Sequence, residues 1–324
     1  MTIARERAAP RTQFFASALC VAAAGLSWSF TGVFLRLAPH LDSWQFLVWR
    51  SFGVACAFAI IIRARGTGSR LKRFVAIGPM GAVVALSLSV ASIAFIVAMK
   101  STTVANALFL SSCAPLLAAI LGYVLLGEKL SLRESASIAL GFVGLGIIVG
   151  GAVETGGLAG NISAVLTALG FAGASVAMRR GAKRDYTPAV LGYGVLVCIL
   201  ATGVCAGKGV SLSHPPLEML AAFAGGLLAM GVGFALFLRG APHVPAAGQT
   251  LLAQTETIFG PIWVWLAFDE KPDVATLIGG AVIFAAVVSM ALTGVSPTRP
   301  KAANGQEEQA LLQAPKASGR QGLE

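Results

Sequence analysis

Ten apolar stretches, each about as long as a bilayer-spanning helix, follow one another along this chain with short breaks between them. A helix of roughly 20 apolar residues crosses the hydrocarbon core of a membrane, and helices and closed barrels are the structures that satisfy the backbone there. The predicted spans are residues 14–36, 42–63, 74–99, 102–126, 132–153, 157–178, 188–207, 217–238, 244–268 and 273–294. The chain is therefore predicted to be an all-α integral membrane protein with ten transmembrane helices.

The composition excludes the main soluble classes. Hydrophobic residues make up 56% of the chain and charged residues 12%, whereas a soluble domain carries about 25% charged residues. A disordered chain, a coiled coil and an ordinary soluble enzyme are all excluded. The five cysteines lie inside apolar stretches without CxxC spacing, so we predict no metal site and no cofactor. They are Cys20, Cys56, Cys113, Cys198 and Cys205.

The positive charge, +10 overall, is distributed unevenly between the two sides of the predicted membrane. With a cytoplasmic N-terminus, 19 of the 24 Lys and Arg residues fall in cytoplasmic segments and four on the opposite side. This asymmetry predicts a cytoplasmic (inner) membrane protein with both termini in the cytoplasm. The positive charge therefore indicates membrane orientation and not binding to nucleic acid. Residues 1–13 form a cytoplasmic N-terminal segment, and the polar stretch 296–324 is predicted to be a disordered cytoplasmic tail.

The two halves of the chain resemble each other at a spacing of about 140 residues. Residues 29–36 align with 172–179, and Gly127-Glu128-Lys129 aligns with Asp269-Glu270-Lys271. Each half holds five predicted spans, an odd number, so the second half enters the membrane from the opposite face. Such inverted repeats are typical of secondary transporters, which bind substrate near the midplane between the repeats. The predicted repeats cover residues 14–153 and 157–294.

The pattern resembles the drug/metabolite transporter superfamily, in its EamA-like branch, over roughly residues 16–294. The resemblance is carried by Leu26-Ser27-Trp28-Ser29-Phe30, Arg50-Ser51-Phe52, Ala114-Pro115, Leu126-Gly127-Glu128-Lys129-Leu130, Val244-Pro245-Ala246-Ala247, Glu256 and Asp269-Glu270-Lys271-Pro272. It implies ten helices in two inverted five-helix repeats that move small organic solutes. Many members export amino acids or related metabolites, and others import vitamins or exchange nucleotide sugars. This chain has Thr257 where the family usually has Pro, with Pro261 one turn later.

Glu256 is the strongest candidate for substrate binding, because it is an acidic residue near the middle of the ninth predicted span. A charge at that depth costs roughly 2.5–3.5 kcal/mol, which favours a protonated, paired or hydrated carboxyl. It would contact a substrate amine, carry a proton, or anchor neighbouring helices. Gln249 lies seven residues earlier, on the same face of a continuous helix, and Gln254 lies on an adjacent face.

Four further residues are candidates for the substrate path. Arg50 lies inside the second span and would bind a substrate carboxylate, snorkel to the surface or pair structurally. Trp28 sits at mid-span rather than at an interface, which favours a cavity wall over the usual aromatic belt. Asn106 in the fourth span and Ser89 in the third would line the path or bond between helices.

Glu128 and Glu270 each follow the fourth helix of a repeat, where a carboxylate opposes the helix dipole. We interpret both as gating or structural residues, together with Pro115 and Pro261, and the alternative is direct substrate contact.

The predicted function is export of a small polar metabolite, such as an amino acid, by a secondary transporter using alternating access. The alternative is uptake of a vitamin or nucleoside-like solute. The HExxH, GxSxG and Walker motifs are absent from the sequence, which disfavours an intramembrane enzyme and an ATP-driven pump, and the inverted repeat disfavours a channel. The expected partners are a small-molecule substrate and the lipid bilayer, without nucleic acid. Proton coupling and the choice between monomer and homodimer remain open.

Overall fold

The computed structural model describes residues 2–65, 70–101, 110–128, 130–150, 158–181, 184–269 and 274–293, and throughout these ranges the regular structure is helical. The elements are α1 (Thr2–Trp28), α2 (Thr31–Arg36), α3 (Ser43–Ala64), α4 (Arg70–Ser101), α6 (Ala114–Leu126), α7 (Leu132–Gly150), α8 (Leu158–Arg180), α9 (Thr187–Gly207), α10 (Pro216–Ala224), η1 (Gly225–Met230), α11 (Gly231–Gly240), η2 (Ala241–His243), α12 (Ala246–Leu252), α13 (Thr255–Phe268) and α14 (Val274–Thr293).

Seven helical segments in the described part of the chain are long and apolar enough to cross a membrane. They are Gln13–Arg36, Ser43–Ala64, Gly78–Ser101, Ala159–Arg180, Thr187–Gly207, Pro216–His243 and Ala246–Phe268. Each lies on a span predicted from the sequence. The helices α6, α7 and α14 lie on the other three predicted spans. The prediction of an all-helical, multi-span membrane protein is therefore confirmed, and its ten helices are compatible with the structure.

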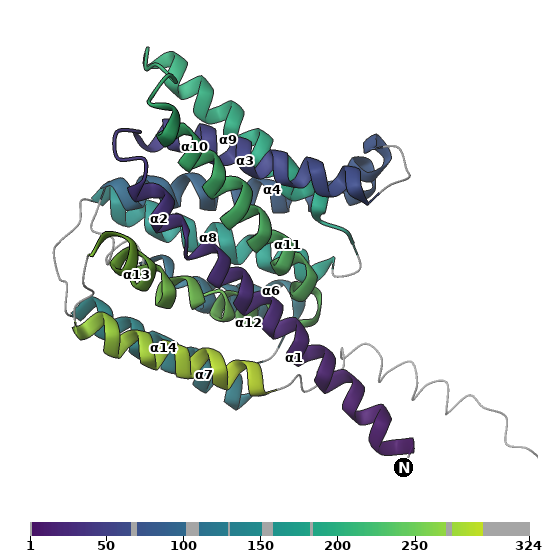
Figure 1. The fold of residues 1–324 in the computed structure, drawn as a ribbon. Helices are drawn as coiled ribbons and strands as arrows, with labels where there is room; N and C mark the ends of the chain where they lie inside the picture. Colours follow the sequence, from purple (N-terminus) through teal and green to yellow (C-terminus); the bar gives the residue numbers. More distant parts are fainter. Residues whose placement is uncertain are drawn as a thin grey trace, which may run out of the picture.

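The two halves of the chain interleave instead of forming two separate bundles (Figure 1). The main helix pairs join one half to the other: α3 with α9, α4 with α8, α1 with α11, α6 with α12, and α7 with α14. Exchanging each span with its counterpart in the other half leaves this pattern unchanged, since it converts the α4–α8 pair into the α11–α1 pair. The pattern of helix pairs is thus symmetric between the two halves, as a repeated sequence predicts.

Small residues allow the paired helices to approach closely. A Cβ atom on Gly170 of α8 would lie 2.7 Å from the Ser87 carbonyl oxygen and 2.8 Å from the Ala91 nitrogen, both on α4. Gly53 of α3 and Gly226 of η1 face each other's backbones in the same way. In lipid, where apolar surface gains little by leaving the solvent, such close contacts are a main source of helix association.

Several spans are broken near their middles, whereas the hydropathy pattern predicts a continuous helix for each. The first span breaks at Ser29-Phe30, between α1 and α2, and the ninth at Ala253-Gln254, between α12 and α13. A turn at Ser112-Cys113 precedes α6 at the position that corresponds to residues 253–254 in the other half. Pro115 lies in the first turn of α6, where its missing N–H costs nothing. Interrupted helices of this kind are typical of the region around transporter binding sites.

Candidate functional site

A central cavity of about 120 Å³, large enough for several water molecules, lies where the broken spans meet. Its wall includes residues at or beside each break, from Trp28 at the end of α1 to Ala114 at the start of α6 and Ala253 in the ninth span. Met230, at the end of the π-helical turn η1, lies on the same wall. The described side chains of α7 and α14 do not line the cavity, and these two helices pack side by side at the edge of the bundle (Figure 1).

Arg50 of α3 brings a cation to this cavity. Its side chain is 2% exposed, so it does not snorkel to the surface. Its Nη1 donates a hydrogen bond to Ser92 Oγ at 2.8 Å, and the Tyr193 hydroxyl donates to the same oxygen at 3.2 Å. The Arg50 Nε is buried and has no hydrogen-bond partner. The guanidinium is therefore anchored on one side and retains donor capacity on the other.

Glu256 brings an acid to the same cavity. It lies in the first turn of α13, where the positive end of the helix dipole favours a carboxylate, and it is partly exposed on the cavity wall. Among the residues that the structure describes, none hydrogen-bonds this carboxylate. Arg50 lines the same cavity. The cavity thus presents a guanidinium from α3 and a carboxyl group from α13.

Gln254 joins two of the breaks. Its Oε1 accepts a hydrogen bond from Thr257 Oγ1 at 2.9 Å and one from Ser112 Oγ at 3.4 Å. The break in the ninth span is held by Thr255, whose Oγ1 donates to the Ala22 carbonyl at 2.7 Å. These side-chain hydrogen bonds fix the lining residues of α13, while the backbone crosses the break through tighter bonds such as that from the Gln254 N–H to the Leu251 carbonyl at 3.0 Å.

Aromatic rings form much of the remaining wall. Trp28 packs against Phe171 with ring centroids 5.7 Å apart and against Phe234 at 5.1 Å, and Tyr193 meets Phe234 at 5.6 Å. All four line the cavity. Such edge and tilted contacts are favourable between rings and give the cavity rigid apolar faces beside its two charges.

The structure thus brings Trp28, Arg50, Gln254 and Glu256 together and leaves other predicted site residues elsewhere. Gln249 is fully buried outside the cavity wall, and its Nε2 donates to the Ala241 and Val244 carbonyls at 2.8 and 2.9 Å. The expected shared face with Glu256 is wrong, because the break at 253–254 separates their helices.

Of the other predicted substrate-binding residues, Ser89 is the one that the structure places away from the cavity wall. Ser89 is buried outside the cavity lining and donates to the Ala85 carbonyl of its own helix at 2.7 Å. Pro261 belongs to α13, and Asn106 lies outside the described residues. Tyr193 also lines the cavity, and the sequence does not predict it, because an isolated aromatic residue in an apolar span carries no distinguishing signal.

An ion pair ties together four helix ends on one side of the bundle. Glu128, after α6, pairs with Arg179 of α8 at 2.7 Å between Oε1 and Nε. Arg179 Nη1 also donates to the Pro242 carbonyl at 2.5 Å, and the Ala246 N–H donates to Glu128 Oε2 at 3.5 Å. Both side chains are about three-quarters buried, with 27% and 22% exposed for Arg179 and Glu128. The corresponding Glu270 lies outside the described residues.

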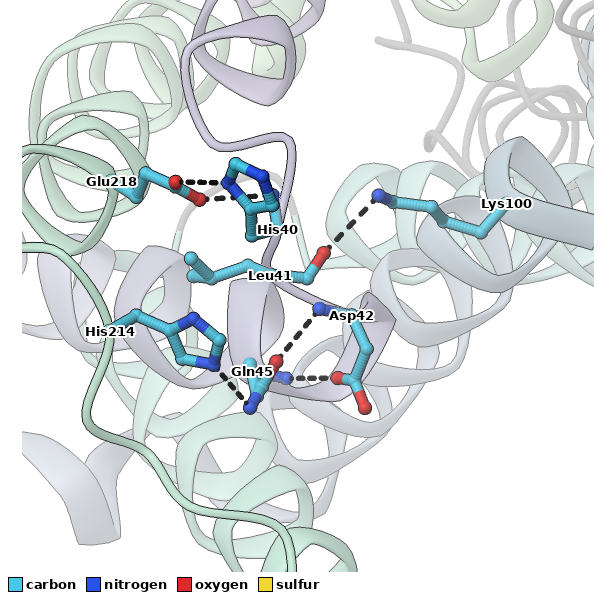
Figure 2. A network of polar contacts seen from close by, with 7 residues as sticks. All are labelled: His40, Leu41, Asp42, Gln45, Lys100, His214 and Glu218. Carbon is cyan, nitrogen blue, oxygen red and sulfur yellow. Dashed lines mark hydrogen bonds and ion pairs between the residues drawn. The ribbon is translucent and has the colours of Figure 1, made fainter.

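Figure 2 shows a polar network at the opposite side of the bundle, between the loop 37–42 and the start of α10. His40 pairs with Glu218 at 2.7 Å between Nδ1 and Oε1, and its backbone N–H donates to Oε2 at 3.0 Å. Lys100, near the end of α4, donates to the Leu41 carbonyl at 3.2 Å. These bonds connect spans from both halves of the chain.

The same network fixes the start of α3. Asp42 and Gln45 form a capping box with two bonds of 2.8 Å. The Gln45 Nε2 then donates to the Ser211 carbonyl at 2.6 Å and meets His214 Nε2 at 2.7 Å (Figure 2). Since Gln45 supplies the donor, the His214 nitrogen must be unprotonated to accept it.

Comparison with known proteins agrees with this architecture. The sequence model of a family described as the EamA-like transporter family matches residues 15–150 and 158–292, one copy in each half. An "Uncharacterized transporter" of Archaeoglobus fulgidus is 27% identical over 216 residues, which cover 64% of this chain and 74% of the relative. A solved structure described as "Crystal structure of protein" has a TM-score of 0.73 at 20% identity and covers 86% of this chain and 98% of that chain. The last likeness concerns the fold alone.

Proposed function

Because the chain belongs to the EamA-like transporter family, we propose that it carries a small zwitterionic metabolite, such as an amino acid, by alternating access. The observation that supports this substrate class is that a guanidinium and a carboxyl group, Arg50 on α3 and Glu256 on α13, line one cavity. Arg50 binds the substrate carboxylate and Glu256 binds its ammonium group. The proposed direction is export across the cytoplasmic membrane, with both termini cytoplasmic as the Lys and Arg distribution predicts.

The geometry of Arg50 supports the carboxylate role. Ser92 occupies Nη1, while the buried Nε has no partner. The Nε–Nη2 edge of a guanidinium matches the two oxygens of a carboxylate. A bound carboxylate would satisfy the buried Nε donor, whose unpaired state is otherwise costly.

The Glu128–Arg179 pair serves as a gate in this proposal and closes the side predicted to be cytoplasmic. On the other side, the His40–Glu218 pair connects the two halves of the chain. The repeat alignment matches Arg179 with Arg36 and Glu128 with Glu270. We therefore propose that an equivalent pair forms at the outer side in the alternate state, where the two repeats exchange conformations.

Replacing Arg179 with Gln is expected to slow transport on the order of 10-fold, because it removes two charge-assisted hydrogen bonds that close one gate. Substrate binding should change little, since Arg179 does not line the cavity. Initial uptake rates and binding isotherms in the same preparation measure both quantities. The matched control is Arg180→Gln, which removes an adjacent exposed cation, and equal rates for the two variants would contradict the gating role.

A second candidate substrate, a vitamin or nucleoside-like solute taken up by the cell, is favoured by the aromatic wall. Trp28, Phe171, Tyr193 and Phe234 offer flat apolar surfaces to a planar ring. This alternative needs no ammonium group on the substrate, so it predicts little dependence on Glu256.

Counterflow in proteoliposomes tests the proposed function. Vesicles are preloaded with one unlabelled solute from a matched set: free amino acids, their amides, their N-acetyl derivatives and neutral nucleosides. We expect the zwitterions to drive labelled zwitterion uptake, and the amides and N-acetyl derivatives to fail, since each lacks one charge. Counterflow by nucleosides alone would favour the second candidate. Non-saturable flux of all solutes would contradict a carrier.

A further inference from the structure

A second and larger cavity, of about 600 Å³, lies between α3, the start of α9 and the π-helical and α11 segments. It shares no lining residue with the central cavity. Its floor is apolar: Phe58, Leu227 and Leu236 contribute side chains, and Gly231 brings α11 so close to α3 that an added Cβ would lie 2.6 Å from Ala57 Cβ. Its volume falls in the range of small-molecule sites, about 300–1,000 Å³.

One rim of this cavity is cationic. Arg65 at the end of α3, Arg184 before α9 and Arg239 near the end of α11 all line it, with Asp185 as the acid among the lining residues. Arg65 is positioned by Thr187, whose hydroxyl accepts from Nη1 at 2.9 Å, and by Asp185 at 3.6 Å. Three arginines against one aspartate leave a net charge of +2 at this rim.

The other rim faces the lipid. Ile60 of α3 and Val232 of α11 line the cavity and are 61% and 50% exposed. The outward side of a membrane-spanning helix is surrounded by acyl chains, so an opening between these residues leads sideways into the bilayer. The arginines stand at the helix ends, at headgroup level. The cationic rim therefore lies where a phospholipid has its headgroup, and the apolar floor lies where it has its acyl chains.

We propose that this cavity binds an anionic phospholipid, with its phosphate on Arg65 and Arg239 and an acyl chain along the floor of α3 and α11. Arginine pairs with phosphate through its planar fork of donors, and basic pockets between transmembrane helices recognise acidic headgroups. The bound lipid would link α3 to α11, two helices that also line the central cavity through Arg50 and Phe234. The assignment does not depend on which solute the protein transports.

The test uses the full chain in nanodiscs or detergent with added phosphatidylglycerol, cardiolipin or phosphatidylcholine, and inorganic phosphate as a separate arm. Native mass spectrometry measures retained lipid, and thermal unfolding measures stabilisation. We expect preferential retention of the anionic lipids, and roughly 30-fold weaker binding in the double variant Arg65→Gln/Arg239→Gln, from the loss of two interfacial cations. The matched control is Arg63→Gln, an exposed arginine on α3 that does not line the cavity.

Equal retention of phosphatidylcholine, or equal losses in the control and the double variant, would overturn the proposal. Stabilisation by inorganic phosphate equal to that by lipid would also overturn it, because the apolar floor would then have no role. A second variant, Ala235→Trp, fills the cavity while retaining every arginine. It should lower lipid retention without altering the elution of folded protein, and unchanged retention would contradict the acyl-chain part of the site.

Discussion

Glu256→Gln should lower transport of a zwitterionic substrate by roughly 100-fold while the protein remains folded. The substitution removes the charge that pairs with the substrate ammonium, and an unpaired charge in a desolvated site costs on the order of 3 kcal/mol. Folding should survive because the described residues make no hydrogen bond to this carboxylate and Gln keeps its shape. Counterflow at saturating and limiting substrate, with elution profiles of the purified protein, measures both effects.

The control for this prediction is Asp269→Asn, the same change of acid to amide at the other end of α13. Asp269 lies outside the cavity and has a φ of 55°, a conformation that Asn tolerates. It should transport like the wild type. If Glu256 carries a coupling proton instead, exchange should survive in Glu256→Gln while the pH dependence of net transport flattens. Wild-type transport by Glu256→Gln at every pH would contradict a role for Glu256 in substrate binding and in proton coupling.

The second large effect is expected at the crossing of α3 and η1. A Cβ on Gly226 would lie within bonding range of the Arg50 carbonyl oxygen and 2.7 Å from its carbonyl carbon, and a Cβ on Gly53 would lie 2.7 Å from the Leu227 nitrogen. These are backbone atoms, so no change of rotamer relieves the clash. Gly226→Ala should therefore destabilise the protein by roughly 3 kcal/mol or more and displace Arg50 from the cavity.

Thermal unfolding of the detergent-solubilised protein, followed by the yield of monodisperse material, measures this change. The control is Gly203→Ala in α9, where an added Cβ meets no atom within 4 Å. Gly203→Ala should be neutral or stabilising by up to about 1 kcal/mol, since Ala is the better helix former. Matching unfolding temperatures for the two variants would show that the α3–η1 crossing relaxes without cost.

The sequence predicts the spans and two residues that line the cavity, Arg50 and Glu256, for physical reasons. Apolar length reports a membrane helix directly, and a charged residue inside such a helix, as at Arg50 and Glu256, is costly enough to require a reason. Trp28 was found in the same way, from its unusual depth. These residues are recognisable because each differs from the apolar side chains that are usual at the centre of a membrane helix.

The remaining parts of the site depend on tertiary packing and were not recognisable. The break at Ala253-Gln254 contains no Pro or Gly, and side-chain bonds such as that from Thr255 to α1 hold it in place. Without that break, Gln249 would have been expected beside Glu256. Ser89 and Ser92 lie on one helix three residues apart, yet Ser92 alone meets Arg50, because the rotation of α4 is fixed by α8 and α9.

The interleaving of the two halves has a consequence for how the protein is made. During synthesis α7 is made long before its main partner α14, which is the last helix of the described chain. Contacts so distant in sequence form slowly, because a long loop must close before they contribute. The spans of the first half must therefore remain in the bilayer without their partner helices until the second half has been made. Arg50 is already inserted at that stage. A chain truncated before α14 would leave α7 without its partner, making it a target for membrane quality-control proteases.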